Sequence, residues 1–262
     1  MKIAVMGMGV AGSYLMARLK DSKHDVTGYE RSAEERHDSI CAWGTIKPIL
    51  REFCKKTDRN FDDFLIHDGK KMHVKMNDDI KFDIGLHGMC TYNKLALIKD
   101  FIKDSKVIYG EAPKLEELEK EYDLIVDCTG FGRAYLPKME EDFFLPTYEY
   151  KVEYENGVPY DDFYIEPFPG MSGYFWYFPL GEKWAHIGAG DYNKQHIKAT
   201  DAFLKKHGGK VLQTKGRPIR LATPNKCKPF YKGKVVGVGE SIGTVYALLG
   251  EGIIPSMQCV DI

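Results

Sequence analysis

The first thirty residues alternate between short apolar runs and turn-forming residues, in an order that predicts a strand, a helix and a second strand. Residues 1–6 are mostly apolar, which is typical of a buried strand. Residues 13–19 carry apolar side chains at helical spacing, and a second apolar stretch over 25–29 ends at Glu30. The chain therefore begins with a β-α-β unit.

Later periodicity predicts more elements of both kinds. Helices are expected over residues 45–57, 92–102 and 194–207. The first of them places four apolar residues on one face: Ile46, Ile49, Leu50 and Phe53. Strands are expected within residues 61–84, over 106–109, 122–126 and 234–238, and as an antiparallel sheet within 143–190. Strand-to-glycine junctions recur at the start, middle and end, which favours one nucleotide-binding domain assembled from separated segments.

The glycines after the first strand have the spacing G-x-G-x-x-G. Gly7 permits a tight turn, Gly9 lets the backbone approach a pyrophosphate, and Gly12 lets the helix pack on its strand. The helix N-terminus offers N–H groups to phosphates. Glu30 follows these glycines at close to the spacing expected for the acidic residue that binds a ribose. The pattern predicts dinucleotide binding; the alternative, a glycine-rich turn without a ligand, leaves these residues unexplained together.

Composition narrows the classes of function. With 262 residues, 44% of them hydrophobic, the chain can bury a substantial core. Its 37 basic and 38 acidic residues nearly cancel, so no nucleic-acid partner is predicted. The apolar runs are shorter than the ~18–20 residues that span a bilayer. Six cysteines without a C-x-x-C pair indicate reduced thiols in a cytoplasmic protein, and the eight histidines show no metal-binding spacing.

Three motifs together carry a resemblance to a known family. They are the N-terminal glycines, the aromatic run Tyr-Phe-Trp-Tyr-Phe-Pro-Leu-Gly over residues 174–181, and a late Gly-Glu pair followed by Gly-Glu-Gly at 250–252. With them the chain resembles the geranylgeranyl reductase family of flavoproteins, especially its archaeal members, which belong to the para-hydroxybenzoate hydroxylase superfamily. The resemblance runs along nearly the whole chain. It implies a lipid-biosynthesis oxidoreductase that uses FAD.

The resemblance also implies which residues bind FAD. Gly7, Gly9 and Gly12 would hold the pyrophosphate, and Glu30 and Arg31 would lie at the adenosine ribose. The ribityl chain and the flavin pyrimidine would be bound by a second set of residues: Gly239, Glu240, Gly250, Gly252 and Ile253. Because Gly250 and Gly252 carry no side chains, backbone N–H groups would reach the flavin ring. The dipole of the following helix would stabilise the reduced flavin.

Two candidate catalytic residues follow from the same resemblance, each with an alternative. Cys41 would lie near the flavin ring; otherwise it is a small buried apolar residue. Glu251 lies between two glycines that approach the flavin, and the alternative is a carboxylate that caps the following helix. Five residues would form the wall of an isoprenoid site: Tyr174, Trp176, Phe178, Pro179 and Gly181. An ordinary sheet core is the alternative for this aromatic run.

We therefore expect an α/β (α+β) fold with a Rossmann-like FAD-binding domain built from discontinuous segments and an inserted antiparallel-sheet substrate domain. The first would comprise residues 1–50, 85–140 and 228–262, and the second 51–84 and 141–227. The helices that normally follow in the family are expected to be absent. Glu240 stands where the family usually has Asp.

The expected function is FAD-dependent reduction of isoprenoid (geranylgeranyl) double bonds, with ferredoxin or NAD(P)H as the open choice of electron donor. A flavin-dependent aromatic hydroxylase and a non-catalytic flavin- or isoprenoid-binding fragment are the alternatives. A lipid substrate implies peripheral membrane contact by a cytoplasmic protein. The basic and aromatic segment 226–232 is better interpreted as a solvated loop than as a membrane-facing edge.

Overall fold

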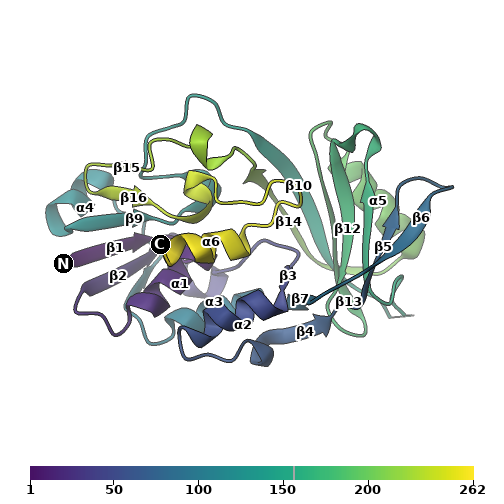
Figure 1. The fold of residues 1–262 in the computed structure, drawn as a ribbon, viewed down its shortest axis with the longest axis horizontal. Helices are drawn as coiled ribbons and strands as arrows, with labels where there is room; N and C mark the ends of the chain where they lie inside the picture. The colour runs from purple at the N-terminus through teal and green to yellow at the C-terminus, as the bar shows by residue number, and fades with distance from the viewer. Residues whose placement is uncertain (156) are drawn as a thin grey trace.

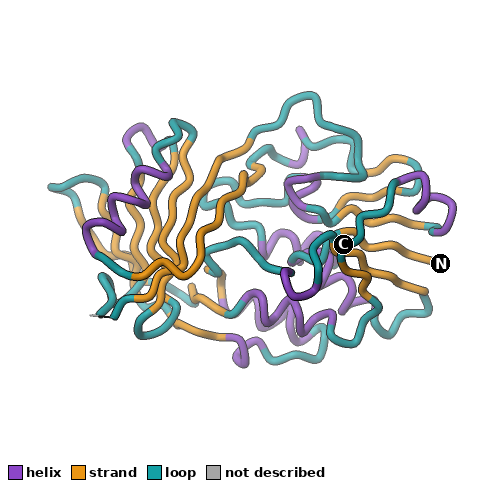
Figure 2. Tube along the Cα trace, turned by 180° about the vertical axis from the view of Figure 1, so that it is seen from behind, coloured by secondary structure: helices purple, strands orange, loops and turns teal. Residues whose placement is uncertain are grey.

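The computed structural model describes residues 1–155 and 157–262, which form two parts lying side by side (Figure 1). One part holds a largely parallel sheet with both chain ends nearby. The other holds a larger, mostly antiparallel sheet. Figure 2 shows the same two parts from behind, with the strands of the larger sheet gathered at the end remote from the termini.

The first sheet is a parallel sheet that is buried on both faces. Its spatial order is β15 (Tyr231–Lys232), β16 (Val235–Gly237), β9 (Leu124–Asp127), β1 (Lys2–Met6), β2 (Asp25–Glu30) and β8 (Val107–Tyr109). Only β15 pairs antiparallel with its neighbour. Ile3 and Val5 pack in one core, whereas Ala4 and Met6 pack in another on the opposite face. Burial on both faces explains why β1 appears as a continuous apolar run.

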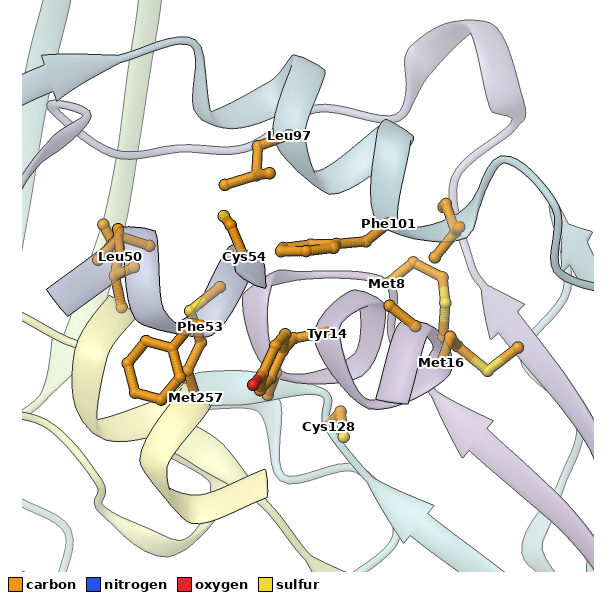
Figure 3. Close-up of a cluster of buried hydrophobic side chains, with 14 of the residues drawn as sticks. Met8, Tyr14, Met16, Leu50, Phe53, Cys54, Leu97, Phe101, Cys128 and Met257 are labelled. Carbon is orange, nitrogen blue, oxygen red and sulfur yellow. The ribbon is translucent and has the colours of Figure 1, made fainter. Parts of the chain in front are cut away.

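Helices cover both faces of this sheet. On one side lie α1 (Val10–Leu19), α2 (Lys47–Lys55), α3 (Lys94–Ile102) and α6 (Ile253–Val260), and on the other lies α4 (Leu115–Glu121). Tyr14 of α1 is at the centre of the larger core (Figure 3). Its ring centroid lies 5.6 Å from those of Phe53 in α2 and Phe101 in α3, in edge-on geometry. Residues from the beginning and end of the chain therefore share one core.

The second sheet has seven strands, and one of its faces is turned toward the first part of the molecule. Its order is β14 (Lys210–Arg220), β10 (Phe144–Glu153), β13 (Trp184–Asp191), β12 (Gly173–Pro179), β11 (Phe163–Pro167), β5 (Lys71–Lys75) and β6 (Lys81–Gly85). The β11–β5 pair alone is parallel. Helix α5 (His196–His207) covers the outer face, where Phe203 stacks on Phe175 at 4.6 Å between ring centroids. Tyr177 packs in the same core, so Trp176 between them faces the other way.

A small third sheet joins the two parts, in the order β3 (Gly44–Ile46), β7 (Met89–Tyr92) and β4 (Leu65–Asp68). Thr91 of β7 donates a hydrogen bond from Oγ1 to the carbonyl oxygen of Pro179, over 2.6 Å. This buried contact ties the third sheet to the end of β12.

The predicted fold class is confirmed, and two details of the prediction are wrong. Helix α3 begins at Lys94 rather than at Tyr92, because Asn93 caps it by accepting a hydrogen bond from the N–H of Ala96 at 3.1 Å. Ile49 is 37% exposed, whereas Leu50 is fully buried. Adjacent helical residues lie ~100° apart around the axis, and the core covers only the side of α2 that carries Leu50.

Two features are absent from the described part of the chain. Within residues 1–155 and 157–262, no helix has the length and apolar character needed to cross a membrane. The same ranges contain no group of three His, Cys, Asp or Glu side chains placed to hold a metal ion.

Candidate functional site

The N-terminal glycine turn has the tight geometry that its spacing predicts. Gly7 has φ +90°, and a Cβ atom there would lie 2.9 Å from the carbonyl oxygen of Cys128 at the end of β9. A Cβ atom at Gly12 would lie only 1.9 Å from the carbonyl oxygen of Gly7, so only glycine fits. At Gly9 such an atom would meet nothing within 4 Å. The turn is thus closed toward the protein and open above Gly9.

Glu30 lies at the carboxyl end of β2, beside this turn. Its Oε2 accepts a hydrogen bond from the N–H of Met8 at 3.0 Å, and its Oε1 accepts one from the N–H of Ser32 at 2.9 Å. These bonds orient the carboxylate, and each oxygen keeps a lone pair for a further donor. Arg31 is exposed to solvent.

The late Gly-Glu pair lies next to the first helix. Gly239 has φ +78°, and a Cβ atom there would lie 2.9 Å from the Cβ of Ala11 in α1. The carboxylate of Glu240 forms an ion pair with Arg217 of β14 and accepts a hydrogen bond from the N–H of Arg220 at 2.9 Å. The backbone of this motif therefore approaches the glycine turn, while its side chain is engaged by the second sheet.

The segment 250–253 leads into α6, which begins at Ile253. Gly250 has φ +63°, Gly252 is the residue before the helix, and Ile253 is buried in the first core. The Oε1 of Glu251 accepts hydrogen bonds from the N–H groups of Ile253 at 2.9 Å and Ile254 at 3.0 Å. This is the capping contact that was the alternative to a catalytic role.

Glu251 also has an unusual electrostatic environment. Its Oε2 is buried and finds no hydrogen-bond partner among the described residues. Burial raises the pKa of this carboxyl above its ordinary value, although the two N–H groups and Lys94 act in the opposite direction. A ligand donor could satisfy the free oxygen.

The loop that carries Cys41 lies against the second sheet. Trp43 has φ +64°, and its N–H points to the Sγ of Cys41 at 3.4 Å. A Cβ atom at Gly44 would lie 2.5 Å from the ring of Phe178 in β12. The Trp43 ring centroid is 5.0 Å from that of His186 in β13. The loop therefore lies between the two parts of the molecule.

The predicted substrate-binding residues lie along β12 and the turn after it. Trp176 is 8% exposed, and Tyr174 and Phe178 are partly buried. The hydroxyl of Tyr174 donates to the carbonyl oxygen of Leu249 at 2.7 Å, which links β12 to the segment before α6. Pro179 ends the strand, and Gly181 lies in the following turn with φ +92°.

Sequence reasoning missed a group of buried polar residues on the same sheet face. Glu149 of β10, His186 of β13 and Lys94 of α3 are 7%, 3% and 8% exposed. Burial raises the pKa of Glu149 to about 7 and lowers that of His186 to about 3. Polar residues alternate with Tyr148 and Tyr150 along this strand, a pattern that does not by itself show that their face is covered. The aromatic strand beside them was the signal that this face is covered.

The predicted site residues thus cluster in two places. The glycine turn, Glu30 and Gly239 lie at the carboxyl ends of parallel strands, where open α/β sheets bind ligands. Cys41, Trp176 and the start of α6 lie where the second sheet meets the first part. Arg31 is exposed to solvent, and its side chain forms no hydrogen bond or ion pair with either group within residues 1–155 and 157–262.

Comparison with known proteins supports the resemblance. No known protein-family profile matches the chain. Digeranylgeranylglycerophospholipid reductase 2 of Methanothermobacter thermautotrophicus is 31% identical over 121 residues, which cover 42% of this chain and 31% of that protein. The matched region therefore spans about a third of this curated relative.

Solved structures share the fold along almost the whole chain. A geranylgeranyl bacteriochlorophyll reductase-like protein of Thermoplasma acidophilum has a TM-score of 0.75 at 18% identity, covering 98% of this chain and 75% of its own. A probable FAD-dependent monooxygenase from Pseudomonas aeruginosa has a TM-score of 0.70 at 13% identity, covering 99% and 84%. A flavin-dependent halogenase from Xanthomonas campestris has 0.68 at 14%, covering 99% and 69%.

The predicted resemblance to geranylgeranyl reductases is confirmed in sequence by the Methanothermobacter relative over 121 residues, and the Thermoplasma structure shows that the fold is shared. The fold itself is that of the flavin-dependent oxidoreductases and halogenases to which the chain is similar.

Proposed function

We propose that the chain binds FAD and reduces carbon–carbon double bonds of an isoprenoid lipid or its precursor. The observation that carries the proposal is the convergence of the glycine turn, Gly239 and the start of α6 beside the Trp176 face of the second sheet. The relatives named as reductases support the same reaction.

The residues present fit FAD. The open space above Gly9 and the free N-terminus of α1 suit a pyrophosphate, and the oriented carboxylate of Glu30 suits the ribose hydroxyls. The ribityl chain would lie along the backbone at Gly239, because the carboxylate of Glu240 is held by Arg217. The flavin pyrimidine would lie at Gly250–Gly252, where Glu251 offers a free buried oxygen.

When bound, FAD supplies the hydride for the reduction. The chain's own residues position the substrate and exclude water from the reacting atoms. Trp176, Tyr174 and Phe178 would hold an isoprenoid chain, whose burial contributes about 25 cal/mol per Å² of apolar surface. Cys41 would contact the same region from the opposite side.

We propose that residues 1–64, 85–140 and 228–262 form the cofactor-binding part and that residues 65–84 and 141–227 form the substrate-binding part. Compared with the division expected from the sequence, residues 51–64 move to the cofactor-binding part, because Phe53 and Phe61 belong to its core. A lipid substrate requires contact with a membrane surface, and ferredoxin and NAD(P)H are the two electron donors to test.

The test is direct. Purified protein should be yellow and release FAD on denaturation, and chemically reduced protein should be reoxidised by a geranylgeranyl glycerophospholipid without oxygen. Protein that cannot take up FAD contradicts the whole proposal. Flavin that is reoxidised only by oxygen, in the presence of an aromatic substrate, would instead indicate a hydroxylase; flavin that no lipid reoxidises would indicate a binding protein.

A further inference from the structure

The buried polar residues beside Trp176 have no role in the proposed binding of FAD and isoprenoid. A carboxyl, an imidazole and an ammonium group are costly to bury unless they are paired or used in chemistry. Here the carboxyl belongs to Glu149, on β10, an interior strand of the second sheet, and it is 7% exposed. Such a group next to an apolar substrate wall calls for an explanation.

Glu149 lies beside the indole of Trp176. Both residues are opposite Gly188 in the register of β10–β13 and β12–β13. A Cβ atom at Gly188 would lie 2.5 Å from Cζ2 of Trp176 and 2.8 Å from Cβ of Glu149. The absence of a side chain at Gly188 therefore lets the indole lie over this strand, close to the side chain of Glu149. The Nε1 of Trp176 is buried without a hydrogen-bond partner among the described residues.

His186 extends the same group toward the loop that carries Cys41. It is 3% exposed, and neither ring nitrogen forms a hydrogen bond of standard geometry within residues 1–155 and 157–262, although the backbone of Cys41 lies close enough to raise its pKa. Its ring lies 5.0 Å from that of Trp43, between centroids. Unpartnered donors and acceptors at this depth indicate a place where a water molecule or a substrate group completes the hydrogen bonding.

Groups that stabilise the carboxylate of Glu149 reach it from several elements. Lys94 approaches from α3, Arg217 approaches from β14, and the backbone of Cys41 contributes from the loop; all three favour the carboxylate. Lys215 lies opposite Glu149 in β14, but its ammonium forms an ion pair with Asp38. Burial outweighs these charges, so the pKa of Glu149 is raised to about 7. The carboxyl can therefore hold a proton near neutral pH, whereas His186 stays neutral because burial lowers its pKa to about 3.

We propose that Glu149 is the proton donor for double-bond reduction, and that Lys94 stabilises the carboxylate left behind; this rests on the proposed function. The O–H bond of Glu149 breaks, and its proton forms a C–H bond at one carbon of the double bond. The π bond breaks, and the other carbon receives the hydride that reduced FAD supplies. The substrate is reduced by two electrons and the flavin is oxidised. Water then returns a proton to Glu149.

The main test uses the flavin-loaded full chain. Protein reduced anaerobically is mixed with a geranylgeranyl glycerophospholipid, and flavin reoxidation is followed over a range of pH. We expect the wild-type rate to fall as pH rises through about 7, because the donor must be protonated. Glu149→Gln should slow reoxidation roughly 100-fold and remove this pH dependence, since general acids contribute 10²–10⁴-fold. Glu149→Asp should retain part of the rate and the pH dependence.

A second readout does not require turnover. Infrared spectra of the chain are recorded at several pH values, once with and once without FAD, and are subtracted between pH values. They should show a protonated carboxyl band that disappears between about pH 6 and pH 9. Glu149→Gln should lack this band. Glu153→Gln, on the same strand and partly exposed, is the matched control and should keep both the band and the rate.

The outcomes separate the two proposals. Wild-type flavin that the lipid never reoxidises overturns the proposed function and the proton donor with it. A wild-type protein that turns over, with a Glu149→Gln variant of equal rate and unchanged pH profile, overturns the proton donor alone. If Glu149→Gln does not fold, Glu149→Asp is used in its place. A Glu149→Asp variant that reacts as fast as the wild type at high pH would overturn the proton donor alone.

Discussion

The buried carboxyl of Glu149 predicts a specific dependence of stability on pH. The ordinary pKa of a glutamate is 4.5, and burial raises that of Glu149 to about 7 in the folded chain. Below pH ~4.5 this carboxyl is protonated in the folded and the unfolded state alike. Between ~4.5 and ~7 the unfolded chain releases the proton and the folded chain keeps it, so stability falls as pH rises.

The size of the effect follows from the shift. Each pKa unit corresponds to ~1.4 kcal/mol, so the complete loss is about 3 kcal/mol, most of which falls between pH 5 and pH 8. Glu149→Gln removes the titrating group and should remove this part of the pH dependence. The substitution also changes packing, but this effect on the free energy of unfolding is the same at both pH values. It therefore cancels when each protein is compared with itself at the two pH values.

The measurement is urea denaturation of the wild type and Glu149→Gln at pH 5 and pH 8, followed by fluorescence. We expect the free energy of unfolding of the wild type to fall more steeply with pH, by roughly 2–3 kcal/mol relative to the variant. Parallel pH dependences for the two proteins would refute the reasoning, because they would mean that the carboxyl titrates equally in both states. Glu153→Gln should behave like the wild type.

Three other substitutions test the site. Gly12→Ala should prevent soluble expression or FAD uptake, since its Cβ would lie 1.9 Å from the carbonyl oxygen of Gly7; flavin content after purification checks this. Gly188→Ala should destabilise the chain by about 1–3 kcal/mol through overpacking against Trp176, measured by thermal denaturation, and an unchanged melting temperature would contradict the close approach. Trp176→Ala should weaken binding of a geranylgeranyl lipid at least tenfold and leave the FAD dissociation constant unchanged. Titrations followed by flavin fluorescence measure both affinities, and equal losses for the two ligands would contradict a substrate role for Trp176.

Much of the fold could be predicted because local periodicity and global architecture agree. Residues 3–6 of β1 are apolar and buried on both faces of the sheet, and Gly7 and Gly12 require the positive φ or the close contact that only glycine allows. In β12 the alternation correctly separates Phe175 and Tyr177 from Trp176. These features depend on residues that are near one another in the sequence.

What the sequence could not reveal depends on contacts between distant segments. Glu149 is buried because the indole of Trp176 and the loop of Cys41 cover a face that its own strand presents as polar. The carboxylate of Glu240 is held by Arg217, a partner that no local motif indicates. Ile49 has the right periodicity, but the core does not reach it. In each case tertiary packing decides the environment.

The order of strands in the first sheet has a consequence for folding while the ribosome synthesises the chain. β9 pairs with β1 on one side and, on the other, with β16, which follows it by more than a hundred residues. While the ribosome is still producing the second sheet, one edge of β9 has no neighbour to pair with, and α6 is not yet available to cover Tyr14. Exposed strand edges and apolar patches promote aggregation of nascent chains. We therefore expect yield in a heterologous host to improve with slower translation or added chaperones, which protect this edge until the last segment emerges.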